Sequence, residues 1–195
     1  MPDNTAVIAR TLIIIAGSRS SGKSTFINWC KAASHDELFP AVLQPIAAID
    51  EPIYFMELRK WADQIHERLV VHVDIFTPFA EIMACTQEAL LEEMTLETFE
   101  RYPNVRLLQQ AEQICCFTLQ PPRELIFKRW LERCAQKKSP LVRTLLTQIY
   151  SGVYGDDLYE RVYQVWEKYL ATLSKVQNWQ VHEHVNGYRM IPWKL

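Results

Sequence analysis

The chain of 195 residues has no excess of positive charge. Its 21 Lys and Arg residues are balanced by 23 Asp and Glu residues, which gives a formal net charge of -2 at pH 7. Such a balance creates no overall basic field that would draw the protein onto nucleic acid or an anionic membrane. We therefore expect neither as a partner, and any anionic ligand must be held by a local site.

Targeting signals and membrane spans are also missing from the sequence. The N-terminal segment contains Asp3 where a signal peptide carries positive charge, and its apolar run ends at Gly17. No run approaches the roughly 20 apolar residues of a transmembrane helix. We expect a cytoplasmic protein.

The cysteines form no recognisable disulfide or metal pattern. They stand at positions 30, 85, 115, 116 and 134, an odd number without the paired spacing of a metal site. Cys115 and Cys116 lie inside an apolar run that is typical of a buried strand. We expect all five to be reduced core residues.

What the sequence does contain is the composition and patterning of one α/β domain. Apolar residues make up 49% and charged residues 23%, as in globular proteins, and the length fits a single domain spanning residues 1–195. Short apolar runs alternate with segments of helical periodicity. The expected strands are residues 11–16, 45–49, 69–75 and 114–119, and the expected helices are residues 23–33, 54–68, 79–101 and 123–136. This alternation predicts a mainly parallel sheet covered by helices.

The last third of the chain departs from simple alternation. Residues 137–155 show no clean period, and we interpret them as an insert. Residues 156–174 return to a strong helical pattern. Two extended runs, residues 179–185 and 188–193, flank Asn186-Gly187, a dipeptide typical of a type I′ turn, so we expect a closing hairpin.

One motif carries most of the functional information. Residues 17–24 read GSRSSGKS, a full match to the phosphate-binding pattern G-x-x-x-x-G-K-(S/T), and a threonine follows. The motif comes after a predicted buried strand and opens a predicted helix, where backbone N–H groups and the helix dipole together bind anions. The residues assigned to this phosphate site are Gly17, Ser18, Arg19, Ser20, Ser21, Gly22, Lys23, Ser24 and Thr25.

On this motif the chain resembles the P-loop NTPases. The resemblance implies a three-layer fold with helices on both faces of the sheet, and ATP or another nucleoside triphosphate bound together with Mg²⁺. It also implies that Lys23 reaches the β- and γ-phosphates and that the Ser24 hydroxyl ligates the ion. Gly17 and Gly22 would allow dihedrals and close approaches that a Cβ forbids.

The resemblance calls for a second acid at the end of a neighbouring strand. Asp74 follows the run LVVHV and is our first choice for an acid that faces the metal or orders water. Asp50, next to Glu51 at the end of residues 45–49, is the rival, because a carboxylate at a strand end also suits a general base for an acceptor hydroxyl. Both assignments remain open at this point.

Signatures elsewhere in the chain indicate which branch of this superfamily it is most similar to. The sequence lacks the Asn-Lys-x-Asp and D-x-x-G patterns of switch GTPases and the LSGGQ of ABC-type ATPases. Residues 119–133 look like the segment of small P-loop kinases in which a strand leads into an arginine-bearing lid helix. Arg129 and Arg133 are four residues apart and so share one helix face. We expect them to close over the transferring phosphate, with residues 129–155 as a helical lid.

We therefore expect an ATP-dependent kinase with Mg²⁺ that phosphorylates a small acceptor such as a nucleoside, a nucleotide or a metabolite. The alternatives are a regulatory P-loop NTPase, a nucleotide-binding module without turnover and a sulfotransferase-like enzyme. The acceptor pocket is expected between the strand ends at Asp50 and Asp74, walled by residues 54–68 and 79–101. The sequence does not determine the oligomeric state, and a homodimer is one of the possible states.

Overall fold

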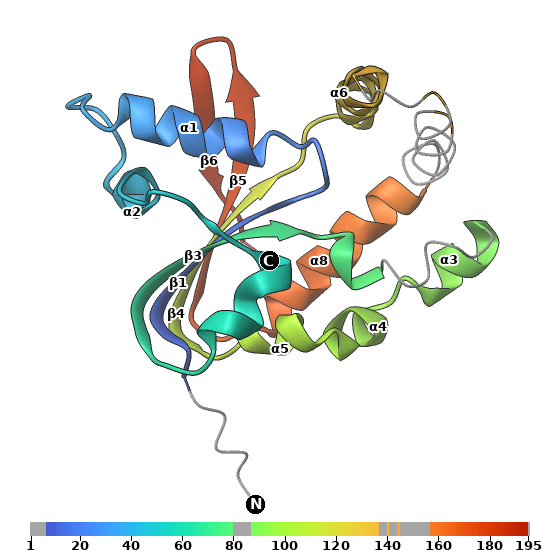
Figure 1. The fold of residues 1–195 in the computed structure, drawn as a ribbon, viewed down its shortest axis with the longest axis horizontal. Coiled ribbons are helices and arrows are strands. Elements are labelled where there is room, and N and C mark those ends of the chain that lie inside the picture. Colours follow the sequence, from blue (N-terminus) through green and yellow to red (C-terminus); the bar gives the residue numbers. More distant parts are fainter. Residues whose placement is uncertain (1–6, 80–86, 137–139, 141–143, 145–156, 195) are drawn as a thin grey trace, which may run out of the picture.

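The structure is a computed structural model that describes residues 7–79, 87–136, 140, 144 and 157–194. Six strands form one sheet in the order β2-β3-β1-β4-β5-β6 (Figure 1). All neighbouring strands are parallel except the antiparallel pair β5 and β6. The strands are β1 (Ala9–Gly17), β2 (Ile53–Tyr54), β3 (His66–Asp74), β4 (Ala111–Leu119), β5 (Val176–His184) and β6 (Gly187–Pro192). The α/β class and the mainly parallel sheet expected from the sequence are confirmed.

β1 is the central strand, as its uninterrupted apolar run predicts. It pairs with β3 on one side and with β4 on the other, and it is buried from Leu12 to Gly17. A strand that is covered on both faces cannot alternate apolar and polar residues. The expected strands at 69–75 and 114–119 correspond to β3 and β4.

Helices cover both faces of this sheet (Figure 1). On one face lie α1 (Lys23–Ala33) and α2 (Gln44–Ala47), which pack Phe26 and Ile46 into a core cluster with Ile13 and Ile15 of β1. The other face carries α4 (Leu96–Arg101), α5 (Pro103–Leu108) and α8 (Leu158–Thr172). The molecule therefore has three layers.

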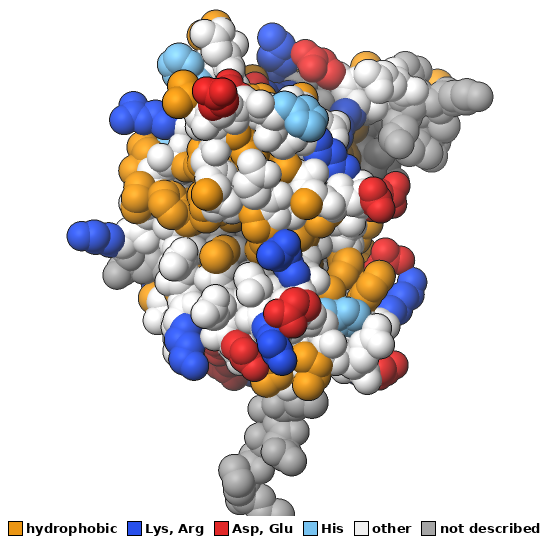
Figure 2. Space-filling model, turned by 90° about the vertical axis from the view of Figure 1, so that its left-hand side faces the viewer, with side chains coloured by type: hydrophobic (Ala, Val, Ile, Leu, Met, Phe, Trp, Pro, Cys, Tyr) orange, Lys and Arg blue, Asp and Glu red, His pale blue; other side chains and the backbone are white. Residues whose placement is uncertain are grey.

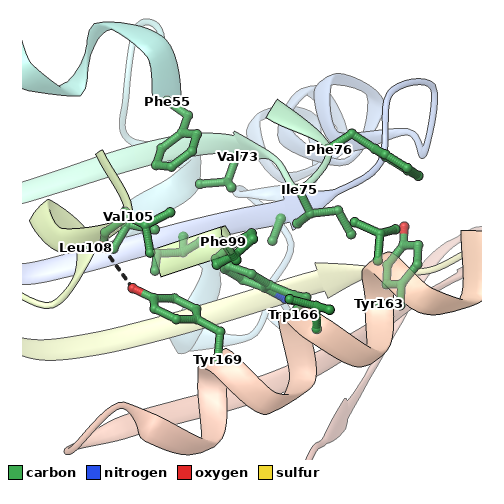
Figure 3. Packing of buried hydrophobic residues seen from close by; sticks show 14 of the residues in the cluster. Phe55, Val73, Ile75, Phe76, Phe99, Val105, Leu108, Tyr163, Trp166 and Tyr169 are labelled. Carbon is green, nitrogen blue, oxygen red and sulfur yellow. Dashed lines mark hydrogen bonds between the residues drawn. The ribbon is translucent and has the colours of Figure 1, made fainter. Parts of the chain in front are cut away.

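The second face holds the larger core (Figure 3). Trp166 and Tyr169 of α8 pack against Phe99 of α4 with ring centroids 5.9 and 5.1 Å apart. The Tyr169 hydroxyl donates a hydrogen bond to the Val105 carbonyl at 2.9 Å. α8 follows the 156–174 pattern closely, because its buried residues recur at helical spacing and all of them belong to this core.

Two further α-helices, α6 (Arg123–Ala135) and α3 (Gln87–Glu93), are described. α6 follows β4 and buries Ile126, Trp130 and Cys134, and α3 precedes α4. The helical pattern at 79–101 thus yields two helices, with residues 80–86 outside the described part. Most of the expected insert at 137–155 also lies outside it, which leaves α6 as the described part of the expected lid.

Two sequence expectations around residue 50 were wrong. Residues 45–47 lie in α2 and form no strand, because Pro45 fits the first turn of a helix and a short apolar run does not distinguish strand from helix. Residues 54–68 form no single helix either: they comprise the end of β2, the 3-10 helix η2 (Phe55–Trp61) and the start of β3. Asp50 consequently follows a helix and stands exposed before β2.

The closing hairpin is confirmed, but its turn lies one residue earlier than expected. His184 pairs with Gly187, so Val185 and Asn186 form the loop. A type I′ turn needs positive φ at both loop residues, whereas Ser20 and Lys175 are the non-glycine residues with positive φ in the described chain. Gly187 has φ +139° and lies against Trp29, whose Nε1 would be 2.5 Å from an added Cβ.

Surface charge agrees with the near-neutral composition. On the face shown in Figure 2, basic and acidic side chains are interspersed and neither sign forms a continuous patch. Among the described helices, none is both long enough and apolar enough to cross a membrane. The four described cysteines are free thiols, and Cys85 lies outside the described residues.

Candidate functional site

The loop between β1 and α1, residues 17–22, forms the centre of the site. Ser20 has φ +66° and Gly22, the N-cap of α1, has φ +96°, so the backbone turns back on itself before the helix begins. The Ser21 amide donates to the Ser18 carbonyl at 3.2 Å, which closes the turn. Backbone curled in this way at a helix N-terminus is suited to binding an anion.

Gly17 is required by close packing at the base of this loop. A Cβ at that position would lie 2.5 Å from Ser21 Oγ and 2.6 Å from the backbone carbonyl oxygen of Leu119 in β4. The carbonyl cannot move aside without disturbing the sheet. The first glycine of the motif therefore lets the loop lie directly against the neighbouring strand.

Lys23, at the first position of α1, folds back into the loop. Its ammonium donates to the carbonyl oxygens of Gly17 at 2.8 Å and Ser18 at 2.6 Å, and the residue is only 4% exposed. Burial lowers the pKa of Lys23 to about 8, although the nearby Asp74 carboxylate favours the charged form. A desolvated cation of this kind interacts strongly with an anion that enters the loop.

Tyr163 of α8 anchors the loop through hydrogen bonds of its hydroxyl group. The Ser18 amide donates to its hydroxyl at 3.1 Å, and the hydroxyl donates to the Leu119 carbonyl at 2.8 Å. Burial raises the pKa of Tyr163 to about 12. The sequence did not predict this role, because a tyrosine in an amphipathic helix looks like ordinary packing.

Asp74 lies beside the loop because β3 is the direct neighbour of β1. In the parallel register Asp74 pairs with Gly17, so both strands end at the same edge of the sheet. One carboxylate oxygen accepts from the Phe76 amide at 3.2 Å, and the other is 3.7 Å from Arg19 Nε. The carboxylate therefore stands next to the loop, where the sequence predicted an acid.

The two arginines of α6, Arg129 and Arg133, also lie beside the loop. Arg133 donates to the Ser20 hydroxyl at 3.3 Å. Arg129 is held by Glu183 of β5, and its other terminal nitrogen, Nη1, is buried and has no hydrogen-bond partner among the described residues. That nitrogen is 3.5 Å from where a Gly22 Cβ would stand. A buried guanidinium N–H without a partner beside an anion-binding loop is a donor available to a ligand.

A cavity of about 990 Å³ lies beside the loop, and Gly17, Ser18 and Tyr163 support the loop without lining this cavity. Its wall includes the assigned residues Arg19, Ser20, Ser21, Gly22, Lys23, Ser24, Thr25, Asp74, Arg129 and Arg133. Asp50 is not part of that wall: it is exposed, and its carbonyl accepts from Lys31 Nζ at 2.5 Å. The structure thus brings Asp74 to the loop and leaves Asp50 apart from it.

No protein-family model, curated protein or solved structure matches this chain. The site must therefore be interpreted from its own geometry and chemistry.

The cavity is also lined by residues outside the predicted phosphate and metal sites. Tyr54 of β2 and Met56 and Glu57 of η2 come from residues 54–68, which the sequence analysis placed in the wall of the acceptor pocket, and His72 and Thr77 lie around the end of β3. Burial, with a smaller effect from the Lys23 ammonium, lowers the pKa of His72 to about 4, so its ring is neutral at pH 7. The sequence analysis expected the segment that contains Glu57 in the pocket wall, but its helix-like periodicity did not single out this carboxylate.

Proposed function

We propose that the protein binds ATP or another nucleoside triphosphate with Mg²⁺ and transfers its γ-phosphoryl group to a small acceptor. The observation that carries the proposal is the convergence of four cationic side chains on a cavity at the N-terminus of α1, with Asp74 beside the loop. The cations are Arg19, Lys23, Arg129 and Arg133, and the cavity is also lined by the acids Glu57 and Glu132. Such a concentration of cations suits a polyanion, and an acid next to the loop suits its metal ion.

The side chains fit the proposed ligand in two further ways. The Lys23 ammonium donates hydrogen bonds to two carbonyl oxygens of the loop. A phosphate that enters the loop would take the place of these neutral acceptors and offer the ammonium a negatively charged one. The buried Nη1 of Arg129 would gain an acceptor. In the described chain no group of three His, Cys, Asp or Glu residues could hold a metal alone. Ser24 and Asp74 would therefore hold Mg²⁺ together with ligand oxygens, and the bound ion would neutralise phosphate charge.

The chain's own residues account for the transfer step. An acceptor hydroxyl oxygen forms a bond to the γ-phosphorus, the bond from that phosphorus to the bridging oxygen breaks, and the nucleoside diphosphate leaves with the electron pair. The acceptor proton passes to a carboxylate of the cavity, Asp74 or Glu57, and then to solvent. Lys23, Arg129 and Arg133 offset the charge that spreads over the moving phosphoryl oxygens. Asp50 has no part in this scheme.

Lys23→Ala tests the proposed site directly. The expected result is at least a hundredfold loss of affinity for Mg²⁺-ATP in titration calorimetry, because the variant removes the cation that the loop surrounds. Lys31→Ala, on the last turn of the same helix, is the matched control and should retain the parental affinity. Equal ATP affinity in the Lys23→Ala variant and the parent would show that the loop is not the triphosphate site.

Turnover separates the kinase from its alternatives. With labelled ATP and a panel of small hydroxyl compounds, a kinase produces diphosphate only when its acceptor is present. A regulatory NTPase releases phosphate slowly without an acceptor, and a binding module does neither. Transfer of a sulfuryl group from a sulfate-carrying nucleotide would identify a sulfotransferase-like enzyme.

A further inference from the structure

The cavity has two walls of different chemical character. The first wall, which we call the phosphate wall, consists of residues 19–25 of the loop and the start of α1, together with Arg129, Glu132, Arg133 and Gln136 at the end of α6. The second, the acceptor wall, consists of Tyr54, Phe55, Met56, Glu57, His72 and Thr77. The two walls face one cavity, but they come from opposite sides of β1: α6 follows β4, and the acceptor wall is built around β2 and β3.

The position of Asp74 decides which end of the triphosphate faces the acceptor wall. Asp74 ends β3, and the next strand outward, β2, pairs Tyr54 with His72 in β3. If Asp74 and Ser24 hold the ion on the terminal phosphates, those phosphates lie on the β3 side of the loop. The acceptor wall then borders the γ-phosphate.

The acceptor wall offers aromatic and apolar surface. Tyr54 is 54% exposed and Met56 71% exposed, although both line the cavity. The Tyr54 ring packs edge-to-face on His72 with centroids 5.4 Å apart. Asn104, itself buried, donates to the Phe55 carbonyl at 2.6 Å and holds the start of η2 in place. A rigid aromatic ring beside a flexible thioether is a surface on which a flat molecule can stack.

The acceptor wall also lacks the cations that a charged acceptor needs. Among its described residues no Lys or Arg occurs, and Glu57 is the single Asp or Glu. Glu57 is bonded to Lys60 at 2.8 Å, but Lys60 is 71% exposed and lies outside the cavity lining. A phosphate or carboxylate on the acceptor would meet a carboxylate there without a compensating cation.

We propose, as an extension that rests on the function proposed above, that the acceptor is an uncharged, planar heteroaromatic molecule with a free hydroxyl, of which a nucleoside is the simplest example. The phosphate wall holds the donor's charge, and the acceptor wall stacks on the ring and accepts hydrogen bonds from neutral donors through Glu57. Nucleoside monophosphates and simple sugars are excluded for different reasons: the first carry an unpaired dianion, and the second have no ring on which Tyr54 can stack.

Matched acceptors test this assignment in the full-length protein. Four ribonucleosides, their 5′-monophosphates and free ribose are each supplied with labelled Mg²⁺-ATP, and transfer is measured as kcat/KM. Binding of each is measured in parallel by calorimetry with a non-hydrolysable ATP analogue present. For at least one nucleoside we expect kcat/KM and binding affinity to be at least tenfold higher than for its monophosphate and for ribose.

Two variants link the preference to the acceptor wall. Glu57→Lys should shift the monophosphate-to-nucleoside ratio at least tenfold toward the monophosphate, because it supplies the missing cation. Glu97→Lys is the control, since Glu97 forms a comparable exposed ion pair with Arg101 on α4, away from the cavity. Tyr54→Ala should weaken nucleoside binding about tenfold. Trp61→Ala, at the end of η2 and outside the cavity lining, is the control and should leave nucleoside binding unchanged.

The outcomes distinguish this inference from the proposed function. If a monophosphate or ribose is the better acceptor, or if no nucleoside binds, the acceptor assignment is wrong while Lys23-dependent ATP binding still stands. If both Glu57→Lys and Glu97→Lys leave the ratio unchanged, the acceptor wall does not set the preference and the inference is overturned. If ATP affinity does not depend on Lys23, the proposed function and this inference fail together.

Discussion

At the residue scale, the Tyr163 hydroxyl ties the 17–22 loop to the rest of the fold. It accepts from the Ser18 amide and donates to the Leu119 carbonyl, and it is buried between them. Tyr163→Phe removes both bonds, so we expect a loss of about 1–3 kcal/mol in unfolding free energy. We also expect weaker Mg²⁺-ATP binding, by roughly tenfold, because the first amide of the loop is no longer held in place.

Tyr169→Phe provides the control for this prediction. Tyr169 is also a buried tyrosine of α8, and its hydroxyl donates to the Val105 carbonyl, away from the loop. Both variants should lower stability in urea unfolding, but only Tyr163→Phe should weaken ATP binding in calorimetry. Equal ATP affinity in the two variants would limit Tyr163 to a purely structural role.

At the element scale, the β5–β6 hairpin contacts both α1, which follows the 17–22 loop, and α6, which carries Arg129 and Arg133. Tyr188 of β6 packs edge-on against Phe26 and Trp29 of α1, and Glu183 of β5 holds Arg129 of α6. Glu183→Gln removes the charge that orients this guanidinium, and we expect roughly a two- to tenfold loss of ATP affinity with little change in stability. Glu67→Gln, whose exposed partner is Arg10, should leave the affinity unchanged. An affinity equal to that of the parent would show that Arg129 needs no anchor on β5.

At the scale of the whole molecule, His72 makes stability depend on pH. Burial lowers the pKa of His72 to about 4 from 6.5, so between these values the unfolded chain binds a proton that the folded chain excludes. The stability associated with neutral His72 is fully present above pH 6.5 and is lost as the pH falls toward 4, by about 3 kcal/mol at most. Urea unfolding at pH 7.0, 5.5 and 4.5 should show a shallower decline for His72→Gln than for the parent or His66→Gln. Parallel declines in all three proteins would contradict this prediction.

Local pattern in the sequence was enough to predict several features of the fold and the site. The uninterrupted, β-branched apolar run of β1 is typical of a strand covered on both faces, and the glycine-bounded loop after it predicted a sharp turn into a helix. Asp74 could be placed at a strand end because β3 carries the same β-branched signal. Local pattern therefore predicted the loop, its lysine and one acid.

The order of the strands in the sheet depends on the packing of the whole chain, and this order assembles the rest of the site. The adjacency of β3 to β1 brings Asp74 to Gly17, whereas the helix at residues 44–47 leaves Asp50 outside the cavity. Several residues of the site lie far from the 17–22 loop in the sequence, namely Tyr163, Glu183 and Glu57. The periodicity of a local segment cannot predict that such residues come together. Strand order, burial and long-range contacts each depend on how two segments pack together. The sequence pattern of a single segment therefore does not determine them.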